Sequence, residues 1–302
     1  MSTLKQLVKM AVPVSRSRYD RQREEIERLT SRLSALEAKY DEEVPKFISR
    51  LELSMLRNRI LPASLAAATN LTSLTPLADY TLHACFEKLQ ALAPAAFAVW
   101  RRLLEVNAEA YEGFPVDSCS VVGHPLAEFF CEYLRSYLVG SVLDIGCGPQ
   151  PVPRYLLEYP VERIAGIDPL GAPVPHPFVF VQGAAEFLPW PDGTFDTVVA
   201  STSLDHVLLP DRVMQEICRV LKPGGHFVTW VSFMAGAKPY DPYSTNVEAI
   251  DKFHLFHFDG PTFEALMSEY FVTRERYFAD QQSSFWSFQV KPGRLERLEE
   301  TA

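Results

Sequence analysis

The chain has 302 residues, of which 47% are hydrophobic and 22% are charged, and its formal net charge is −9. This length allows one large domain or two ordinary ones, and the composition excludes disordered, collagen-like and disulfide-scaffold proteins. All 14 glycines lie between Gly113 and Gly293. The first 110 residues carry 16 basic and 13 acidic side chains, whereas the remainder carries 13 and 25. These differences predict two differently built regions, residues 1–112 and residues 113–302.

Charge and cysteine content limit the kinds of binding partner and the cellular compartment that the sequence predicts. The acidic C-terminal region argues against nucleic acid as a partner, because phosphate neutralisation needs a clustered basic face. The five cysteines include no CxxC pair, which is typical of a reducing compartment and argues against a structural zinc site. No apolar run reaches the roughly 18 residues of a membrane span, and the first 20 residues lack the apolar core of a signal peptide. The sequence therefore predicts a cytoplasmic protein without an integral membrane segment.

The N-terminal region shows helical patterns. Within residues 16–43, apolar side chains from Ile26 to Tyr40 recur at spacings of 3, 4, 3 and 4. This is the seam of a short coiled coil of about two heptads, and it fits either a helical hairpin or a dimeric coil. A second helix is expected over residues 46–60, and a long helical pattern covers residues 77–110. We therefore predict an all-α region, with a homodimer through these helices as one arrangement.

After a linker, helices and strands alternate, which is typical of βαβ units and a parallel sheet. A helix is expected over residues 125–138. The strands are expected over residues 141–145, 163–168, 177–182, 195–201, 225–232, 271–279 and 283–290, and the last two read as a hairpin. Residues 233–259 form an unusually long connection, and connections of that length in a compact domain are usually functional.

The segment VLDIGCGPQ, residues 142–150, is the strongest chemical signal. A buried strand ends in a turn whose glycines let backbone amides approach a ligand, and a helix is expected just beyond it. Pro151 stands where a dinucleotide fingerprint has a third glycine or an alanine, which opposes an NAD-dependent dehydrogenase. The Gly-Lys-Ser/Thr of a phosphate-binding loop is also absent. Asp144 lies two residues before the first glycine, where it can meet a cationic or hydroxylated ligand.

Four further segments follow in order. Asp168 ends the second strand 24 residues after Asp144, where a carboxylate can accept both hydroxyls of a ribose. The third segment comprises QGAAEFLP and PDGTFDTVV, residues 182–189 and 191–199. The fourth is STSLDHV, residues 201–207, and the fifth is LKPGG, residues 221–225.

Taken together, the five segments resemble the class I S-adenosylmethionine-dependent methyltransferases, in their small-molecule branch, over about residues 121–290. The resemblance implies an α/β fold, a seven-stranded, Rossmann-like and mostly parallel sheet with helices on both faces. It also implies S-adenosylmethionine as the cofactor. The cofactor-binding residues that it implies are Asp144, Gly146, Gly148, Asp168, Pro169, Ala185 and Ser201.

The resemblance implies a role for each part of this set. Gly146 and Gly148 pass under the methionine part, Asp144 faces its amino-acid end, and Asp168 holds the ribose. The chain departs from the family at Ala184, where an acid is common, so a backbone contact is expected to hold the adenine instead. It also has Gln150 where a third glycine is common.

Methyl transfer from a sulfonium is an in-line displacement, in which the protein aligns the acceptor and removes a proton if the acceptor is a hydroxyl. Histidine suits that proton transfer. His206 follows the fourth strand on the expected cofactor side, so we predict it as the catalytic base. Asp205 beside it is predicted to orient the imidazole or to accept from the substrate. A helix-start histidine bonded to backbone is the alternative for His206.

The connection 233–259 resembles the acceptor-covering region of the family. Its candidate substrate residues are Tyr240, Tyr243, His254 and His257. If residues 251–258 are helical, the two histidines share one face. Their spacing also suits a metal pair, but no third ligand is evident nearby, so the sequence predicts no metal site.

We therefore predict an enzyme that transfers a methyl group from S-adenosylmethionine to a small molecule. The expected acceptor is a hydroxyl, for instance of a sugar or glycolipid precursor. Two alternatives stay open: N-methylation of a small molecule, and a non-catalytic cofactor-binding scaffold whose helical half binds partners.

Overall fold

The computed structural model describes residues 74–112 and 124–292. The coiled-coil segment 16–43 and the helix expected over residues 46–60 lie outside these residues, as does a homodimer through them. No helix in the described part of the chain is long and apolar enough to cross a membrane.

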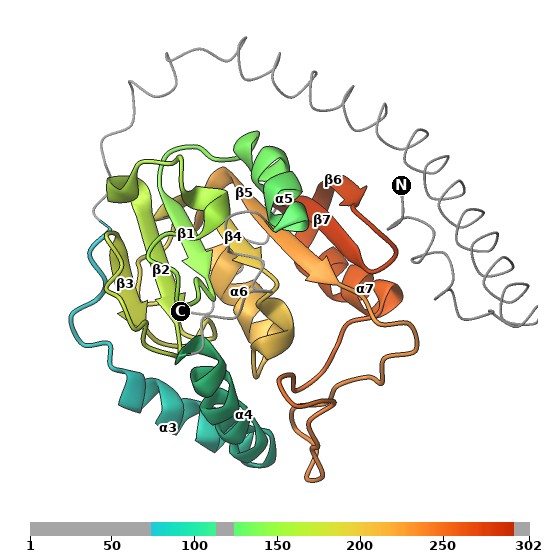
Figure 1. Ribbon diagram of the computed structural model, residues 1–302. Coiled ribbons are helices and arrows are strands. Elements are labelled where there is room, and N and C mark those ends of the chain that lie inside the picture. The colour runs from blue at the N-terminus through green and yellow to red at the C-terminus, as the bar shows by residue number, and fades with distance from the viewer. Residues whose placement is uncertain (1–73, 113–123, 293–302) are drawn as a thin grey trace, which may run out of the picture. The chain divides into compact units, whose positions relative to one another are not determined.

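A seven-stranded sheet in the order β3-β2-β1-β4-β5-β7-β6 forms the centre of the described part (Figure 1). β1 to β5 pair in parallel, whereas β7 pairs antiparallel with both β5 and β6. The predicted seven-stranded, mostly parallel sheet is thereby confirmed. Its strands are β1 (Val142–Ile145), β2 (Ile164–Asp168), β3 (Val179–Gln182), β4 (Phe195–Ser201), β5 (Leu221–Ser232), β6 (Phe271–Phe278) and β7 (Ser283–Val290).

Helices cover both faces of this sheet. On one face pack α6 (Pro210–Val220) and α7 (Gly260–Tyr270), and on the other packs α5 (Pro125–Arg135). α3 (Leu82–Leu92) and α4 (Pro94–Glu112) lie at the carboxyl ends of the parallel strands (Figure 1). The period-two alternation of a strand sends side chains to both layers. In β1, Leu143 and Ile145 join the first layer's core and Val142 joins the second. Burial on both faces explains why the central strands read as continuous apolar runs.

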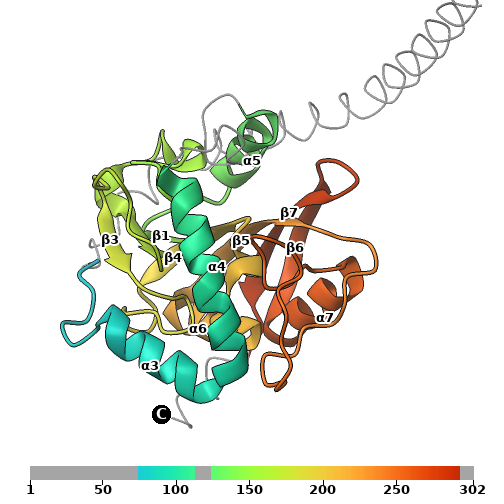
Figure 2. The same ribbon diagram turned by 60° about the horizontal axis from the view of Figure 1, so that its bottom comes forward.

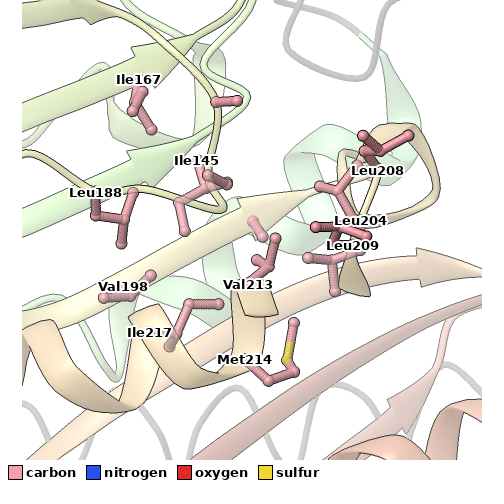
Figure 3. Close-up of a cluster of buried hydrophobic side chains, with 14 of the residues drawn as sticks. Ile145, Ile167, Leu188, Val198, Leu204, Leu208, Leu209, Val213, Met214 and Ile217 are labelled. Atoms are coloured by element: carbon pink, nitrogen blue, oxygen red, sulfur yellow. The ribbon is translucent and has the colours of Figure 1, made fainter. Parts of the chain in front are cut away.

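α6 illustrates how the first layer is held. Val213, Met214 and Ile217 lie on its buried side and pack toward Val198 of β4 and Ile145 of β1 (Figure 3). Complete burial of each such side chain contributes about 1.5–3 kcal/mol. This packing fixes the segment between β4 and α6 against the sheet.

The long helical pattern over residues 77–110 forms two helices. The break falls between Leu92 and Pro94, because proline lacks the amide that a continuous helix needs. Leu89 of α3 and Trp100 of α4 belong to the same buried cluster as Leu143 of the sheet. The division of the chain at residue 112 stays a prediction, but these two helices pack with the sheet.

The helix expected directly after the glycine turn does not form. A 3₁₀ helix (η2, Arg154–Leu156) takes its place, and a second one (η3, Val161–Arg163) precedes β2. Prolines at positions 149, 151 and 153 account for this difference. Each lacks a backbone donor and disfavours the helical conformation of the residue before it.

Candidate active site

A cavity of about 550 Å³ lies at the carboxyl ends of the parallel strands. The chain runs from β1 to β2 and β3 on one side and then to β4 on the other. Ligands of open α/β sheets bind at such a reversal. The cavity is lined by residues at the carboxyl ends of four strands, namely 145–149 at β1, 167–170 at β2, 183–186 at β3 and 201–203 at β4.

The turn after β1 requires glycine. Gly146 and Gly148 have φ angles of +71° and +69°, a region that side chains other than glycine rarely adopt. A Cβ on Gly146 would lie 2.4 Å from the Cβ of Ser203. The Ser203 hydroxyl in turn donates to the Ile145 carbonyl at 2.6 Å. The turn therefore brings the ends of β1 and β4 into direct contact at the cavity.

Backbone strain marks the same place on β4. Thr202, directly after the strand, has a φ of +53° and lines the cavity. A β-branched residue in the left-handed region is a genuine outlier, and such outliers cluster at functional sites.

Asp168 joins the ends of β1 and β2. One carboxylate oxygen accepts from the Gly148 amide at 3.0 Å and the other from the Leu170 amide at 2.8 Å. The side chain is only 3% exposed, yet it lines the cavity. The strand-end carboxylate is thus held in a fixed orientation at the ligand-accessible surface.

Asp144 lies beneath the turn and does not line the cavity. Its carboxylate is fully buried and accepts from the Tyr155 hydroxyl at 3.1 and 3.2 Å. Burial raises the pKa of Asp144 to about 8, the charge of Asp168 adds to this effect, and the bond from Tyr155 opposes it. Burial also raises the pKa of the Cys147 thiol, together with the charges of Asp168 and Asp144. Tyr155, not Asp144, is the cavity-lining member of the pair.

One wall of the cavity comes from α4, which crosses in front of the sheet in Figure 2. Trp100, Leu104 and Asn107 of this helix line the cavity. The Trp100 indole donates to the backbone carbonyl of His206 at 2.7 Å, and the Asn107 amide donates to that of Phe253 at 3.1 Å. α4 therefore anchors both the segment after β4 and the connection 233–259.

Trp230 of β5 lines the other side of the cavity. Its ring packs against Phe130 of α5 and Phe285 of β7. Its indole nitrogen is buried and has no hydrogen-bond partner among the described residues. A buried donor without a partner costs about 1–3 kcal/mol.

The histidines and aspartates expected near the acceptor come together in the structure. His254 Nδ1 lies 2.9 Å from both carboxylate oxygens of Asp251, and His257 Nε2 lies 2.8 Å from one of them. His257 Nδ1 also lies 3.6 Å from Asp205. The ring of His206 faces that of His254 with a centroid separation of 4.5 Å.

Burial and charge set the pKa values within this cluster. Burial lowers the pKa of His206, although the charge of Asp205 opposes the effect. The interactions of His257 with Asp205 and Asp251 raise its pKa against the effect of burial. Burial alone would raise the pKa of Asp205, but the three neighbouring histidines lower it overall.

The family comparison agrees with this geometry. Residues 143–229, from β1 into β5, match the family described as "Methyltransferase domain". This match and the seven-stranded sheet agree with the resemblance to the class I methyltransferases. The resemblance stated from the five segments is therefore confirmed.

Relatives of the methyltransferase domain match only part of their own length. The ubiquinone/menaquinone biosynthesis C-methyltransferase UbiE of Francisella tularensis is 34% identical over 106 residues, which cover 34% of this chain and 41% of that protein. The mitochondrial arginine-hydroxylase NDUFAF5 of Rattus norvegicus is 34% identical over 113 residues, which cover 35% of this chain and 32% of that protein. The chain thus spans less than half the length of these relatives.

Solved structures similar to the chain include two with low sequence identity. The PH0226 protein of Pyrococcus horikoshii has a TM-score of 0.47 at 23% identity and covers 61% of this chain and 99% of its own. The 1,6-didemethyltoxoflavin-N1-methyltransferase of Burkholderia thailandensis, with bound S-adenosylhomocysteine, has a TM-score of 0.48 at 16% identity, with coverages of 72% and 94%.

Most of the predicted site residues line the cavity of the methyltransferase domain. They are Gly146, Gly148, Asp168, Pro169, Ala185, Ser201, His206 and His254. Asp144, Asp205, Tyr240, Tyr243 and His257 do not line it. The roles of both groups stay predictions, and the structure adds where each side chain lies.

The two tyrosines of the connection have other surroundings. Tyr240 stacks on Phe256 at 4.6 Å between ring centroids and donates to the Leu208 carbonyl at 3.0 Å. Tyr243 is 67% exposed. Residues 251–258 form no helix, and His254 and His257 are brought together by Asp251 rather than by helical spacing.

Several lining residues were not predicted from the sequence. Trp100, Asn107, Tyr155 and Trp230 lie in segments that read as ordinary apolar helix or strand. Their contribution depends on contacts with residues far away in the chain, which local patterns do not reveal.

Proposed function

We propose that this protein is an S-adenosylmethionine-dependent methyltransferase acting on a small molecule. The observation that carries the proposal is the strand-end cavity within the domain that matches the methyltransferase family. Its floor combines a glycine turn that admits no side chain with a fixed, cavity-lining carboxylate.

The residues around the cavity fit the proposed cofactor. The ring of Trp230 gives the cavity an apolar wall. Asp168 suits the hydroxyls of a ribose, and the small Ala184 and Ala185 leave a backbone edge for a flat ring. We propose that Gly146 and Gly148 pass beneath the methionine part and that Ser201 and Pro169 complete the site. Asp144 supports this site through Tyr155.

The cofactor supplies an electrophilic methyl group on a sulfonium, so this chain's residues need to exclude water, align the acceptor and manage its proton. A hydroxyl acceptor would have to lose its proton as it gains the methyl group, so the chain would need a base beside the acceptor. We propose that His206 takes the proton, because its ring lines the cavity and α4 holds its backbone through Trp100. Asp205 would then support the cluster through His257.

For the atom that receives the methyl group, one relative favours a second candidate besides oxygen. UbiE, a relative at 34% identity, is named a C-methyltransferase, which favours carbon as a second candidate. Both chemistries need the same cofactor site, and they differ in the product. NDUFAF5, also at 34% identity, is named an arginine-hydroxylase, so the assay must detect the methyl transfer itself.

Calorimetry on the full chain tests the cofactor site. S-adenosylmethionine and S-adenosylhomocysteine should each bind with a stoichiometry of one. Asp168→Ala should weaken binding by about 10- to 150-fold through loss of a charge-assisted hydrogen bond, worth about 1.5–3 kcal/mol. The matched control is Asp192→Ala, because Asp192 is exposed and pairs with Arg219 away from the cavity. Absence of binding by the native protein would overturn the cofactor proposal.

A second experiment separates the enzyme from a scaffold. Release of S-adenosylhomocysteine is followed with small hydroxylated molecules, amines and electron-rich rings, and the methylated atom is located by mass spectrometry and NMR. Turnover with an alcohol supports O-methylation, and turnover only with electron-rich rings supports methylation at carbon. Cofactor binding without turnover on any class would favour the scaffold.

We also propose, from the sequence pattern alone, a cytoplasmic location and pairing of chains through residues 16–43. Light scattering of the full chain measures its mass in solution. A mass of about one chain at micromolar concentration would contradict the pairing.

A further inference from the structure

Two histidines and one aspartate meet at the edge of the cavity. Asp205 and His206 belong to a 3₁₀ helix after β4 (η4, Leu204–His206), and His254 belongs to the connection 233–259. Their ligating atoms all lie within 4.8 Å of one another. His206 and His254 also line the cavity. Of the histidine pair considered from the sequence, only His254 belongs to this set, and Asp205 and His206 come from the segment after β4, about 50 residues away in the chain.

The spacing of these atoms leaves room for an ion. His254 Nε2 and Asp205 Oδ2 are 4.0 Å apart, which is too far for a hydrogen bond. A cation with bonds of about 2.0–2.2 Å to nitrogen and oxygen keeps neighbouring ligand atoms roughly 3.0–3.5 Å apart. Side-chain shifts of less than about 1 Å would therefore complete the coordination.

A second carboxylate orients the histidine of the connection. Asp251 lies 2.9 Å from His254 Nδ1 and is itself held by the backbone amides of Phe253 and His254 at 2.8 Å each. An N–H donated from Nδ1 leaves the lone pair of Nε2 directed to the Asp205 side. Metal-binding histidines almost always donate their other nitrogen to such a carboxylate or carbonyl.

The neighbouring residues hold both halves of the cluster in place. His257 bridges Asp251 at 2.8 Å and Asp205 at 3.6 Å, so it ties the two carboxylates together. On the other side, α4 binds the carbonyls of His206 and Phe253 through Trp100 and Asn107. Ligands from distant segments are thereby positioned before any ion binds.

We propose that Asp205, His206 and His254 form a binding site for one divalent transition-metal cation, with Asp251 and His257 as its supporting shell. Two imidazoles and one carboxylate suit Zn²⁺, Fe²⁺, Co²⁺ or Mn²⁺. Mg²⁺ and Ca²⁺ are disfavoured, because they prefer oxygen ligands. Three protein ligands leave coordination positions open to the cavity, as in metal sites that act on a bound substrate.

The consequence for substrate choice rests on the function proposed above. A cation here would hold an oxygen-bearing acceptor in the cavity and increase the acidity of its hydroxyl. With the cation bound, His206 would act as its ligand, and the proton-accepting role proposed above for His206 applies to the metal-free site. The proposed acceptors are therefore molecules with a chelating pair of oxygens, such as vicinal diols or hydroxy ketones.

The test uses the untagged full-length protein after treatment with a chelator. Co²⁺ is titrated in, and binding is followed by calorimetry and by visible absorption, which distinguishes nitrogen and oxygen ligands from thiolates. We expect one Co²⁺ per chain. His254→Ala and Asp205→Asn should each weaken binding by more than about 100-fold, and Asp251→Asn by about 10- to 100-fold.

The matched control is His83→Ala, because His83 is an exposed histidine that pairs with Glu87 on α3. Circular dichroism confirms the fold of each variant, and His254 lies on an irregular connection, so its replacement tests the site even if Asp205→Asn fails to fold. Co²⁺ binding below one per chain, or equal affinities for His254→Ala and His83→Ala, would overturn the proposal.

Failure of this proposal is distinguishable from failure of the proposed function. The Co²⁺ titration needs neither cofactor nor acceptor, and the binding of S-adenosylhomocysteine is measured separately. A protein that binds the cofactor but no Co²⁺ refutes the metal site alone. A protein that binds Co²⁺ at these residues but no cofactor refutes the methyltransferase function alone.

Discussion

Replacement of Gly146 by alanine tests whether the cavity floor depends on close approach of two strand ends. Gly146 has a φ of +71°, and an added Cβ would lie 2.4 Å from the Cβ of Ser203. Gly193 has a similar φ of +60°, but an added Cβ there meets nothing within 4 Å. The two glycines therefore share the backbone conformation and differ in the space around them.

The two replacements should differ by the energy of the clash. The left-handed conformation costs an alanine about 1–2 kcal/mol, and this is the whole loss expected for Gly193→Ala. Overpacking adds about 1–3 kcal/mol, so Gly146→Ala should lose about 2–5 kcal/mol of unfolding free energy. Ser203→Gly removes the clashing atom, so the double variant should recover the overpacking part.

Urea denaturation of the full chain measures these losses. All four tryptophans lie between residues 100 and 286, so their fluorescence follows the described part of the chain. A double-mutant cycle gives the coupling between positions 146 and 203, expected at about 1–3 kcal/mol. Equal losses for Gly146→Ala and Gly193→Ala, or a coupling near zero, would refute the close approach.

Two more outcomes follow from the buried polar groups. Asp144 has a pKa of about 8 in the folded state against about 3.9 unfolded, so its stabilising contribution is complete below pH 4 and is lost as the pH rises through 8. Asp144→Asn lacks this dependence, so its unfolding free energy relative to the native protein should rise by up to about 1.4 kcal/mol per pH unit between pH 5 and 8. Urea denaturation at several pH values measures both proteins, and the same pH dependence of the unfolding free energy in both would contradict a buried neutral Asp144. Trp100→Phe removes the donor to the His206 carbonyl and should cost about 1–3 kcal/mol and weaken Co²⁺ binding. Trp190→Phe, which removes a similar indole bond elsewhere, should cost stability alone.

The strands of the domain were predictable because local patterns determine them. The expected strands 195–201 and 283–290 coincide with β4 and β7, and the others differ by a few residues at their ends. β5 begins at Leu221 instead of residue 225, because the LKPGG segment continues the strand. The expected helix after Gly148 was wrong, because the preference of a glycine turn for a following helix is overridden by three prolines nearby.

The candidate site was predictable only where it lies at strand ends. Gly146, Gly148 and Asp168 were found because their position follows from the order of strands and turns. The proximity of His254 to Asp205, in contrast, depends on how residues 233–259 fold back onto the sheet. The sequence of this irregular connection has no helical or strand periodicity from which its course could be predicted. The wall made by α4 was missed for the same reason, because its packing is set by tertiary contacts.

This division also indicates where substrate choice resides. The segment shared with the methyltransferase family ends at residue 229, and it contains the cavity floor with Gly146 and Asp168. The wall residues Trp100, Asn107 and His254 lie outside that segment. Relatives that match about a third of this chain therefore bear on the floor and leave the acceptor undetermined. We expect substitutions on α4 and in the connection 233–259 to alter acceptor choice while the affinity for S-adenosylhomocysteine is retained, and substitutions in the floor to do the reverse.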